Sequence, residues 1–351
     1  MKPITVPFFI SHQGCPHTCI FCDQRTISGS AGALPDGAEI AEKVHVWQRS
    51  AGNRILEVAF FGGTFTALPR RSQEQVLAPL QPLLAAGTIA SVRVSTRPDA
   101  VDADTVEWLA NRGVGTIEIG VQSMDDGVLA AAGRGHDAAA STAAIRCIKA
   151  RGLSAGAQLM PGLPGETPPL ALRSLESVIA AGADFVRLYP VVVLAGTGLA
   201  RRFAAGDYRP LGIGEGVALC KRLLHAAMKA GVPVTRIGLQ ADEGLNTDTV
   251  LAGCWHPALG QLVRSELYFD LFRQLSQGEG AVPRAIRCHP SRVSDCVGQG
   301  RANLGRLGEQ WPKVKLLTDS SLAEEEIGLD YCDHYLKGDI ITDLHYTIHE
   351  V

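Results

Sequence analysis

Short runs of β-branched and aromatic residues alternate with longer stretches rich in Ala and Leu over the first 240 residues. The runs have the composition of strands and cover residues 4–10, 56–61, 91–96, 116–121, 153–159, 185–193 and 232–237. The intervening stretches have the apolar spacing of helices and cover residues 38–49, 71–86, 104–112, 138–151, 169–181 and 214–230. Strands that alternate with helices of this length predict parallel β-α-β units. We therefore expect an α/β fold, a partial or complete TIM-like (β/α) barrel, with a doubly wound open sheet as the alternative.

The pattern changes after residue 240. Residues 241–280 have a helical pattern, and shorter elements follow. The elements expected there are strands near 284–288, 313–318 and 340–348 and a helix near 299–310. The chain is thus expected to hold a barrel domain over residues 1–240 and a small C-terminal α+β region over residues 241–351. This region is a candidate cap for the substrate site, because the loop face of a barrel is otherwise open to water.

Composition narrows the class of protein. Hydrophobic residues make up 46% of the chain and charged residues 20%, which is ordinary for a globular protein with a large core. The net charge of -3 provides no general attraction to nucleic acid or to an anionic membrane. No stretch reaches the ~18 consecutive apolar residues that cross a bilayer, and the amino terminus lacks the pattern of a signal peptide. We expect a cytoplasmic protein without a membrane partner, whose nine cysteines are reduced, metal-binding or buried.

Three of these cysteines form a compact motif directly after the first expected strand. Cys15, Cys19 and Cys22 have the spacing CxxxCxxC. Three thiolates on one loop can each bind one iron of a [4Fe-4S] cluster, which normally has four protein ligands, so one iron stays open for another ligand. Two other interpretations are a zinc ion bound together with His12 or His17, and buried thiols without a metal. The position after the first strand, ahead of a glycine-rich second loop, favours the cluster.

The segment CPHTCIFC resembles the signature of the radical S-adenosylmethionine (SAM) superfamily. Its members bind the amino and carboxylate groups of SAM at the open iron, and one electron then cleaves SAM to a 5′-deoxyadenosyl radical. The resemblance extends over about residues 4–240. The segments VSTRPD, IGVQSMDDGVLAAAGRGH and MPGLPGE are most similar to the radical SAM core of the Elongator catalytic subunit, within a group that includes MiaB-type methylthiotransferases and oxygen-independent coproporphyrinogen oxidase. The acetyltransferase domain of Elongator has no counterpart here, so acetyl transfer is not implied.

The resemblance implies a SAM site in the loops that follow the next strands. Gly62, Gly63 and Thr64 match the family's GGE-type motif, with Thr64 in place of the acid. In such folds the backbone of this loop receives the methionine ammonium of SAM, and glycine is needed because a Cβ would block the approach. Thr64 supplies no negative charge, which leaves its own contribution open.

Four further side chains are expected to bind SAM. Gln122 ends the fourth strand with an amide that can bond ribose hydroxyls, and Gln158 occupies a position where relatives often carry a ribose-binding acid. Arg134 matches the arginine that binds the methionine carboxylate in the coproporphyrinogen oxidase group, with a surface or helix-capping arginine as the alternative. Phe21, before the last cysteine, can shield the cluster and stack near the adenine.

Other polar residues of these loops have open roles. Arg97 faces the same site in the predicted barrel and either contacts a ligand or forms a structural ion pair. His136 is a candidate proton donor, although a histidine satisfied within its loop is the better interpretation. The MPGLPGE loop is expected to shape the adenine pocket through its backbone, and the role of Glu166 is less defined.

The C-terminal third offers two weaker signals. Cys254, Cys288 and Cys296 suggest an auxiliary metal site, but their spacing matches no compact ligand motif. A Gly-rich turn at 298–300 between two short helices resembles KH-type RNA-binding folds imperfectly, and three arginines add local positive charge. These arginines are Arg292, Arg301 and Arg306.

The leading hypothesis is a radical SAM enzyme that takes electrons from a flavodoxin- or ferredoxin-type reductant. The Elongator-like and MiaB-like segments favour tRNA or another RNA as substrate. The acidic net charge favours a small molecule or a peptide. A zinc-stabilised binding module without catalytic activity is the alternative of another class.

Overall fold

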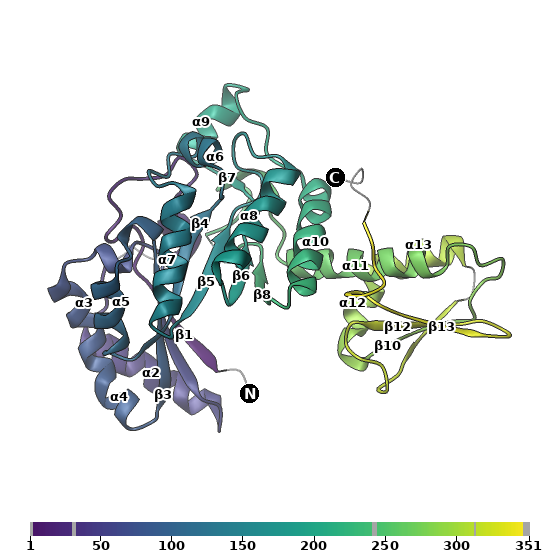
Figure 1. Cartoon of the computed structure of the whole chain (residues 1–351), viewed down its shortest axis with the longest axis horizontal. Helices are drawn as coiled ribbons and strands as arrows, with labels where there is room; N and C mark the ends of the chain where they lie inside the picture. Colours follow the sequence, from purple (N-terminus) through teal and green to yellow (C-terminus); the bar gives the residue numbers. More distant parts are fainter. Residues whose placement is uncertain (1–2, 30–32, 241–243, 312–313, 347–351) are drawn as a thin grey trace.

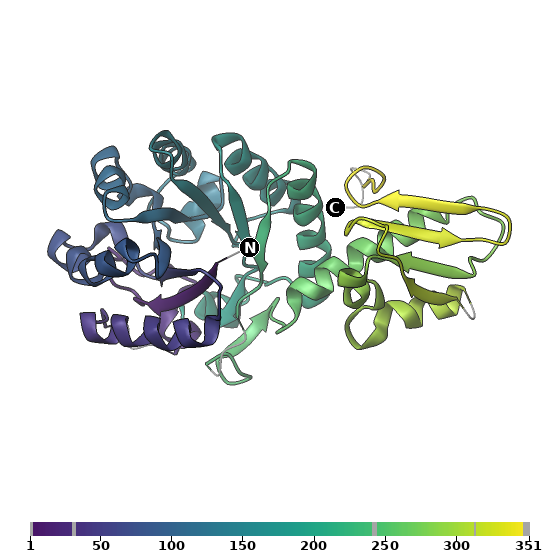
Figure 2. The same cartoon turned by 90° about the horizontal axis from the view of Figure 1, so that it is seen from below.

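The chain folds around one curled parallel sheet. The structure, a computed structural model, describes residues 3–29, 33–240, 244–311 and 314–346. Its seven parallel strands are β1 (Ile4–Phe9), β2 (Leu56–Phe61), β3 (Ile89–Thr96), β4 (Val114–Gln122), β5 (Ser154–Leu159), β6 (Phe185–Leu188) and β8 (Val234–Ile237). They lie in the order β1-β2-β3-β4-β5-β6-β8 and form a half-barrel (Figures 1 and 2). This sequential order confirms the expected partial barrel and excludes a doubly wound sheet, in which the strand order reverses.

Helices cover the convex face of this sheet (Figure 1). They are α2 (Gly37–Ala51), α3 (Arg70–Leu77), α4 (Gln81–Ala85), α5 (Ala103–Ala110), α7 (Ala138–Ala150), α8 (Pro168–Ala181) and α10 (Ile213–Lys229), with the shorter α1 (Gln24–Ser28), α6 (Asp126–Ala131) and α9 (Gly198–Ala204) in the loops. Five helices of the described chain start at an aspartate whose carboxylate accepts a hydrogen bond from a backbone N–H of the first turn, which satisfies one otherwise unpaired donor. These aspartates are Asp23, Asp36, Asp102, Asp125 and Asp137. The main core forms between the helices and the sheet and includes Val58, Val94 and Ile117.

Two expected elements are divided in the structure. The helix expected over 71–86 is two helices, α3 and α4, joined by a single 3-10 turn at Ala78–Leu80. Pro79 and Pro82 lie in this segment, and proline cannot donate the backbone hydrogen bond of a continuous helix. The strand expected over 185–193 ends at Leu188, and Val192–Leu194 forms a separate strand, β7. Strand β7 pairs antiparallel with β9 (Val250–Gly253) outside the barrel sheet.

The last part of the chain is a four-stranded α+β unit. It contains α11 (Leu259–Leu275), β10 (Ala285–Cys288), α12 (Val293–Val297), α13 (Ala302–Gln310), β11 (Lys315–Thr318), β12 (Glu326–Asp330) and β13 (Tyr335–Asp339). The strand order is β11-β10-β12-β13. The strand expected near 340–348 is wrong over the described residues 340–346. The Asp339 carboxylate accepts hydrogen bonds from the N–H groups of Ile341 and Thr342 and turns the chain there; residues 347 and 348 lie outside the described residues.

This C-terminal unit lies beside the barrel, next to α10, in both views (Figures 1 and 2). Lys221 of α10 forms an ion pair of 2.6 Å with Asp270 of α11. The His225 ring nitrogen Nε2 lies 2.9 Å from the carbonyl oxygen of Ile340. The unit is therefore attached to the flank of the barrel through α10. Within the described part of the chain, no helix combines the length and the apolar character that crossing a membrane requires.

Candidate active site

The concave face of the half-barrel is polar, whereas its convex face is apolar. On β3, Val92 and Val94 are fully buried under the helices, and the alternate residues Arg93 and Ser95 point to the other side. A cavity of about 520 Å³ lies on this concave side and reaches into the loops that follow the strands. This volume is within the range of small-molecule sites.

The three cysteines of the motif line this cavity. Burial and the neighbouring Cys19 and Cys15 thiols raise the pKa of Cys22 to about 12. Three thiolates this close repel one another unless positive charge is placed between them, and a coordinated metal deprotonates a thiol by supplying that charge. The donor set therefore fits a [4Fe-4S] cluster, which would take one thiolate at each of three iron atoms.

The two histidines considered as zinc ligands are engaged elsewhere. The His12 ring accepts a hydrogen bond of 3.0 Å from the backbone N–H of Gln24. The His17 Nε2 atom lies 3.1 Å from the Gly133 carbonyl oxygen and 3.2 Å from the Arg97 guanidinium. Among the described residues, no three His, Cys, Asp or Glu side chains converge on a position for a single metal ion. The thiols thus surround the cavity without a histidine that completes a zinc site.

The glycine loop after β2 packs directly on the cysteine loop. Gly63 has a φ of +60°, and a Cβ there would lie 2.4 Å from the Gln13 carbonyl oxygen, so no other residue fits this contact. The Gly63 N–H donates to the Gln24 side chain and the Thr64 N–H donates to the Gln13 carbonyl, both at 2.7 Å. Gly62 and Gly63 line the cavity with their backbone. Because these N–H groups are paired, the loop is suited to a ligand that donates hydrogen bonds, such as an ammonium group.

Thr64 takes a different place from its two neighbours. It is fully buried, and its hydroxyl lies 3.3 Å from the Cys15 thiol. The side chain thus contacts the cysteine motif.

Arg134 is buried, with only 5% of its surface exposed, which excludes the surface-arginine alternative. Its guanidinium donates to the Cys19 thiol at 3.2 Å and to the Gly120 carbonyl oxygen at 2.5 Å. Its Nε atom is buried without a hydrogen-bond partner among the described residues. Buried donors without a partner are rare in folded proteins, so Arg134 has the capacity to donate to one further acceptor.

Gln122 and Gln158 meet on the cavity wall. The Gln158 amide donates to the Gln122 side-chain oxygen at 3.3 Å, and both residues line the cavity. Gln122 has a φ of +71° at the end of β4, and a Cβ at Gly120 would lie 2.9 Å from its amide nitrogen. Phe21 is also a buried residue of the wall. The structure therefore brings the expected thiols, glycines, glutamines, arginine and aromatic ring to one cavity or to its immediate wall.

Sequence models of two domain families match most of this region. The model described as the radical SAM superfamily matches residues 9–172, which include the cysteine motif, the glycine loop, Gln122 and Arg134. The model described as the Radical_SAM C-terminal domain matches residues 183–268. The chain belongs to the radical SAM superfamily. The family uses a [4Fe-4S] cluster and SAM, and the protein is an enzyme of this class.

Curated relatives share parts of this radical SAM core. An uncharacterized protein of Methanocaldococcus jannaschii is 27% identical over 225 residues, which are 60% of this chain and 69% of that protein. Protein YhcC of Escherichia coli K12 is 28% identical over 193 residues, which are 54% of this chain and 60% of that protein. A tRNA uridine(34) acetyltransferase of Methanocaldococcus infernus is 26% identical over 198 residues, 56% of this chain but only 34% of that enzyme. The chain thus spans between one third and about two thirds of these relatives.

One solved structure supports the fold. The archaeal Elp3 of Methanocaldococcus infernus superposes on this radical SAM protein with a TM-score of 0.60 and 21% identity. The match covers 75% of this chain and 62% of that one. The similarity to the Elongator-type radical SAM core is confirmed.

Two other residues singled out in the radical SAM loops lie in structural positions. Arg97 forms a bidentate ion pair with Asp99 of its own loop, at 2.9 and 2.8 Å, although it also borders the cavity. The His136 Nε2 atom lies 3.3 Å from the Val121 carbonyl oxygen. Burial, followed by the nearby positive charge of Arg134, lowers the pKa of His136 to about 4. His136 is therefore neutral near pH 7. Its other ring nitrogen, Nδ1, is buried without a hydrogen-bond partner among the described residues, so the histidine is not fully satisfied within its loop.

Glu166 holds the MPGLPGE loop in place. Its carboxylate accepts hydrogen bonds from the Ser123 hydroxyl at 3.1 Å and from the Gly162 N–H at 2.8 Å. Burial raises the pKa of Glu166 to about 7, from an ordinary value of 4.5. The folded protein thus binds this proton more tightly than the unfolded chain does.

We expect this proton to make the stability of the protein fall between pH 4.5 and pH 7. The contribution is fully present below pH 4.5 and is lost as the pH rises through about 7. Over this window the free energy of unfolding should fall by roughly 3 kcal/mol relative to Glu166→Gln, whose amide does not titrate. Urea unfolding of both proteins at pH 5 and pH 8 measures the difference. If the free energy of unfolding had the same pH dependence in both proteins, the raised pKa of Glu166 would be contradicted.

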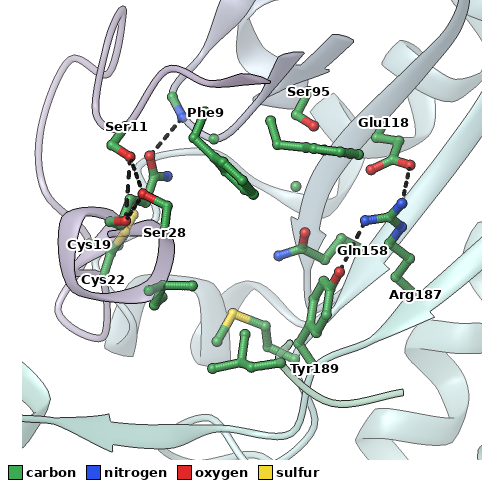
Figure 3. Close-up of a pocket in the computed structure, with 18 of the residues that line it drawn as sticks. Phe9, Ser11, Cys19, Cys22, Ser28, Ser95, Glu118, Gln158, Arg187 and Tyr189 are labelled. Carbon is green, nitrogen blue, oxygen red and sulfur yellow. Dashed lines mark hydrogen bonds and ion pairs between the residues drawn. The ribbon is translucent and has the colours of Figure 1, made fainter. Parts of the chain in front are cut away.

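Charged residues on the strands complete the cavity and were missed by the sequence analysis. Glu118 of β4 forms ion pairs with Arg93 at 2.6 Å and with Arg187 of β6 at 3.0 Å. Arg187 donates to the Tyr189 hydroxyl at 3.1 Å, on the side of the cavity opposite Cys19 in Figure 3. The sequence did contain a signal for this polar face. Strands covered on both faces are apolar throughout, so charged residues that alternate with β-branched ones indicate that one face of these strands is polar.

The C-terminal cysteines and arginines do not reach this cavity. Every described residue that lines it lies between Thr5 and Gln240. Cys288 and Cys296 are buried next to each other in the C-terminal core, and the described residues show no three-ligand metal site there. Arg292 pairs with Glu324 and Asp295, and Arg306 pairs with Glu266. Carboxylates thus neutralise two of the three arginines considered for RNA binding.

Proposed function

We propose that this enzyme binds a [4Fe-4S] cluster through Cys15, Cys19 and Cys22 and cleaves SAM to a 5′-deoxyadenosyl radical that takes a hydrogen atom from its substrate. One observation carries the proposal: the three thiols, the Gly62–Gly63 backbone and the buried Arg134 lie around one cavity. When bound, a reduced cluster supplies the electron for this cleavage.

The protein groups around the cavity have distinct proposed roles. The backbone of Gly62 and Gly63 accepts hydrogen bonds from the SAM ammonium group, and the unpartnered Nε side of Arg134 pairs with the SAM carboxylate. Gln122 and Gln158 present amide groups to the ribose hydroxyls. Phe21 excludes water from the thiols. Together these groups orient SAM and limit side reactions with solvent.

Cofactor content and SAM cleavage test the proposal directly. Protein purified without oxygen should be brown, because iron–sulfur clusters absorb visible light, whereas zinc protein is colourless. With SAM and a flavodoxin- or ferredoxin-type reductant, it should form 5′-deoxyadenosine. A colourless zinc protein that leaves SAM intact would support the binding-module alternative.

Substitution of Arg134 is expected to weaken SAM binding. Loss of a charge-assisted pair costs roughly 1.5–3 kcal/mol, which is about ten- to a hundred-fold in Kd. Arg134→Lys should restore only part of the affinity, because an ammonium group lacks the two-pronged geometry of guanidinium. Equilibrium binding of SAM to Arg134→Ala measures the effect, and iron analysis of the same protein tests the contact with Cys19 separately. Unchanged SAM affinity would remove Arg134 from the SAM site.

The substrate is the least constrained part of the proposal. The tRNA uridine(34) acetyltransferase among the relatives favours tRNA, because it shares the radical SAM core. The interior of the cavity, with Glu118, Arg187 and Tyr189 on its wall, favours a substrate group small enough to enter the half-barrel. Transfer of deuterium from labelled RNA or metabolite fractions into 5′-deoxyadenosine distinguishes the two.

A further inference from the structure

Two arginines lie side by side on the concave face of the sheet. Arg187 of β6 and Arg236 of β8 are direct partners in the parallel register of the two strands. Both line the cavity, while Val186 and Leu188 point to the opposite face and are fully buried. The fold therefore places two guanidinium groups next to each other inside the half-barrel.

The carboxylates of this face are already shared among other arginines. Arg93 lies between Glu57 at 2.7 Å and Glu118 at 2.6 Å, and Glu118 also pairs with Arg187 at 3.0 Å. Two carboxylates thus serve Arg93 and Arg187. Arg236 donates through Nε to the Gly238 carbonyl oxygen, and no carboxylate of the described residues lies within ion-pair distance of it. Among the described residues, Arg236 is therefore a cationic side chain of this cavity without a carboxylate partner.

Arg187 also has a hydrogen-bond donor without a partner among the described residues. Its terminal nitrogens are held by Glu118 and the Tyr189 hydroxyl, and its guanidinium lies 5.1 Å from the centre of the Phe61 ring. Its Nε atom is nevertheless buried without a partner among the described residues. An unpaired buried donor costs about 1–3 kcal/mol, so such a group in a native fold calls for an acceptor.

The position of these groups separates them from the cluster. Figure 3 shows Cys19 and Cys22 on one side of the cavity and Glu118 and Arg187 on the other, with Gln158 between them. A SAM molecule held by Gly62, Gly63 and Arg134 would occupy the cysteine side. The arginine side is then left for the molecule that reacts.

We propose that Arg236 and Arg187 form an oxyanion subsite that binds a carboxylate or phosphate group of the substrate. The assignment rests on the proposed function, because it takes the cysteine side of the cavity as the SAM site. Guanidinium groups suit such anions, since they present paired N–H donors in the plane of a carboxylate or phosphate face. Arg187 is fixed by Glu118 and Tyr189, whereas the terminal nitrogens of Arg236 have no hydrogen-bond partner among the described residues, so the pair combines a rigid and an adaptable contact.

Binding of simple anions tests the subsite without the unknown substrate. Inorganic phosphate and malonate are titrated into the full-length holoprotein saturated with SAM, at constant ionic strength with chloride, and binding is measured by calorimetry. We expect at least one anion to bind to the wild type and its Kd to rise about tenfold or more in Arg236→Gln, with partial recovery in Arg236→Lys. A preference for phosphate or for malonate indicates which group the substrate carries.

Two control variants identify the responsible arginine. Arg151 forms an exposed ion pair with Glu107 on the outer helices, so Arg151→Gln should bind the anions like the wild type. Arg209→Gln should do so as well, because Arg209 forms an exposed ion pair with Glu215 outside the cavity. Absence of binding to the wild type, or equal affinity in Arg236→Gln, would overturn the subsite.

Formation of 5′-deoxyadenosine without substrate is measured in the same preparations. It reports the proposed function separately, because Arg236 lies outside the groups assigned to the cluster and SAM. Cleavage of SAM with no anion site refutes the subsite alone, whereas an anion site without SAM cleavage refutes the proposed function.

Discussion

Replacing Cys15, Cys19 or Cys22 with alanine is expected to remove the iron and the SAM-cleaving activity together. A cubane that loses one of three thiolates exposes a second iron and becomes labile. Each variant should therefore fall from about four irons per chain to near zero, and formation of 5′-deoxyadenosine should become undetectable. Iron analysis, the visible spectrum and product formation under anaerobic conditions measure the loss. Any variant that keeps the full iron content would remove that cysteine from the ligand set.

Cys332→Ala is the matched control for this series. Cys332 is an exposed thiol in the turn between β12 and β13, so its removal should change neither the fold nor the iron content. Cys254, Cys288 and Cys296 are less suitable controls, because they are buried and their truncation would leave cavities. Iron loss in Cys332→Ala would show that the assay responds to thiols in general.

Replacing Glu118 with glutamine is expected to destabilise the whole barrel. The carboxylate is 5% exposed and joins Arg93 and Arg187 across three strands. Burial alone would lower the pKa of Arg93, but the charges of Glu118 and Glu57 raise it above the ordinary value, which shows that the guanidinium depends on these partners. Removing one member of a buried ion network leaves a buried charge uncompensated and costs about 3–5 kcal/mol. Urea unfolding monitored by circular dichroism measures the change.

Glu107→Gln is the corresponding surface substitution. Glu107 pairs with Arg151 at 2.9 Å, but both side chains are exposed. Exposed pairs contribute about 0–1 kcal/mol, so this variant should unfold close to the wild type. A loss of less than about 1 kcal/mol in Glu118→Gln would mean that water screens the network as it screens a surface pair.

The alternation of strands and helices was sufficient to predict the barrel, because each β-α-β unit carries its own hydrophobic pattern. The local breaks were harder to place. Pro79 and Pro82 divide one helix, yet proline within a helical pattern can also be accommodated at a helix start. The C-terminal strands are short and lie in a mixed sheet. Neither the spacing of their apolar residues nor their length therefore distinguishes them from the adjoining turns.

The candidate site was predictable where the chemistry depends on contiguous residues. The cysteine motif and the Gly62–Gly63 pair are local patterns, and the structure brings both to one cavity. The contacts of Thr64 with Cys15 and of Arg134 with Cys19 join residues far apart in the chain, and no local pattern indicates them. The Glu118–Arg187 pair likewise depends on which strands are neighbours and on which face each side chain lies.

The Gln24 side chain has a consequence for how the two cofactors would influence each other. Its oxygen accepts the N–H of His12 in the cysteine loop and the N–H of Gly63 in the glycine loop, both at 2.7 Å. A ligand that restricts the motion of one loop therefore lowers the entropy that the other loop loses when its own ligand binds. Such coupling is reciprocal. If the assembled cluster increases the affinity for SAM by some factor, bound SAM increases the affinity of the protein for the cluster by the same factor.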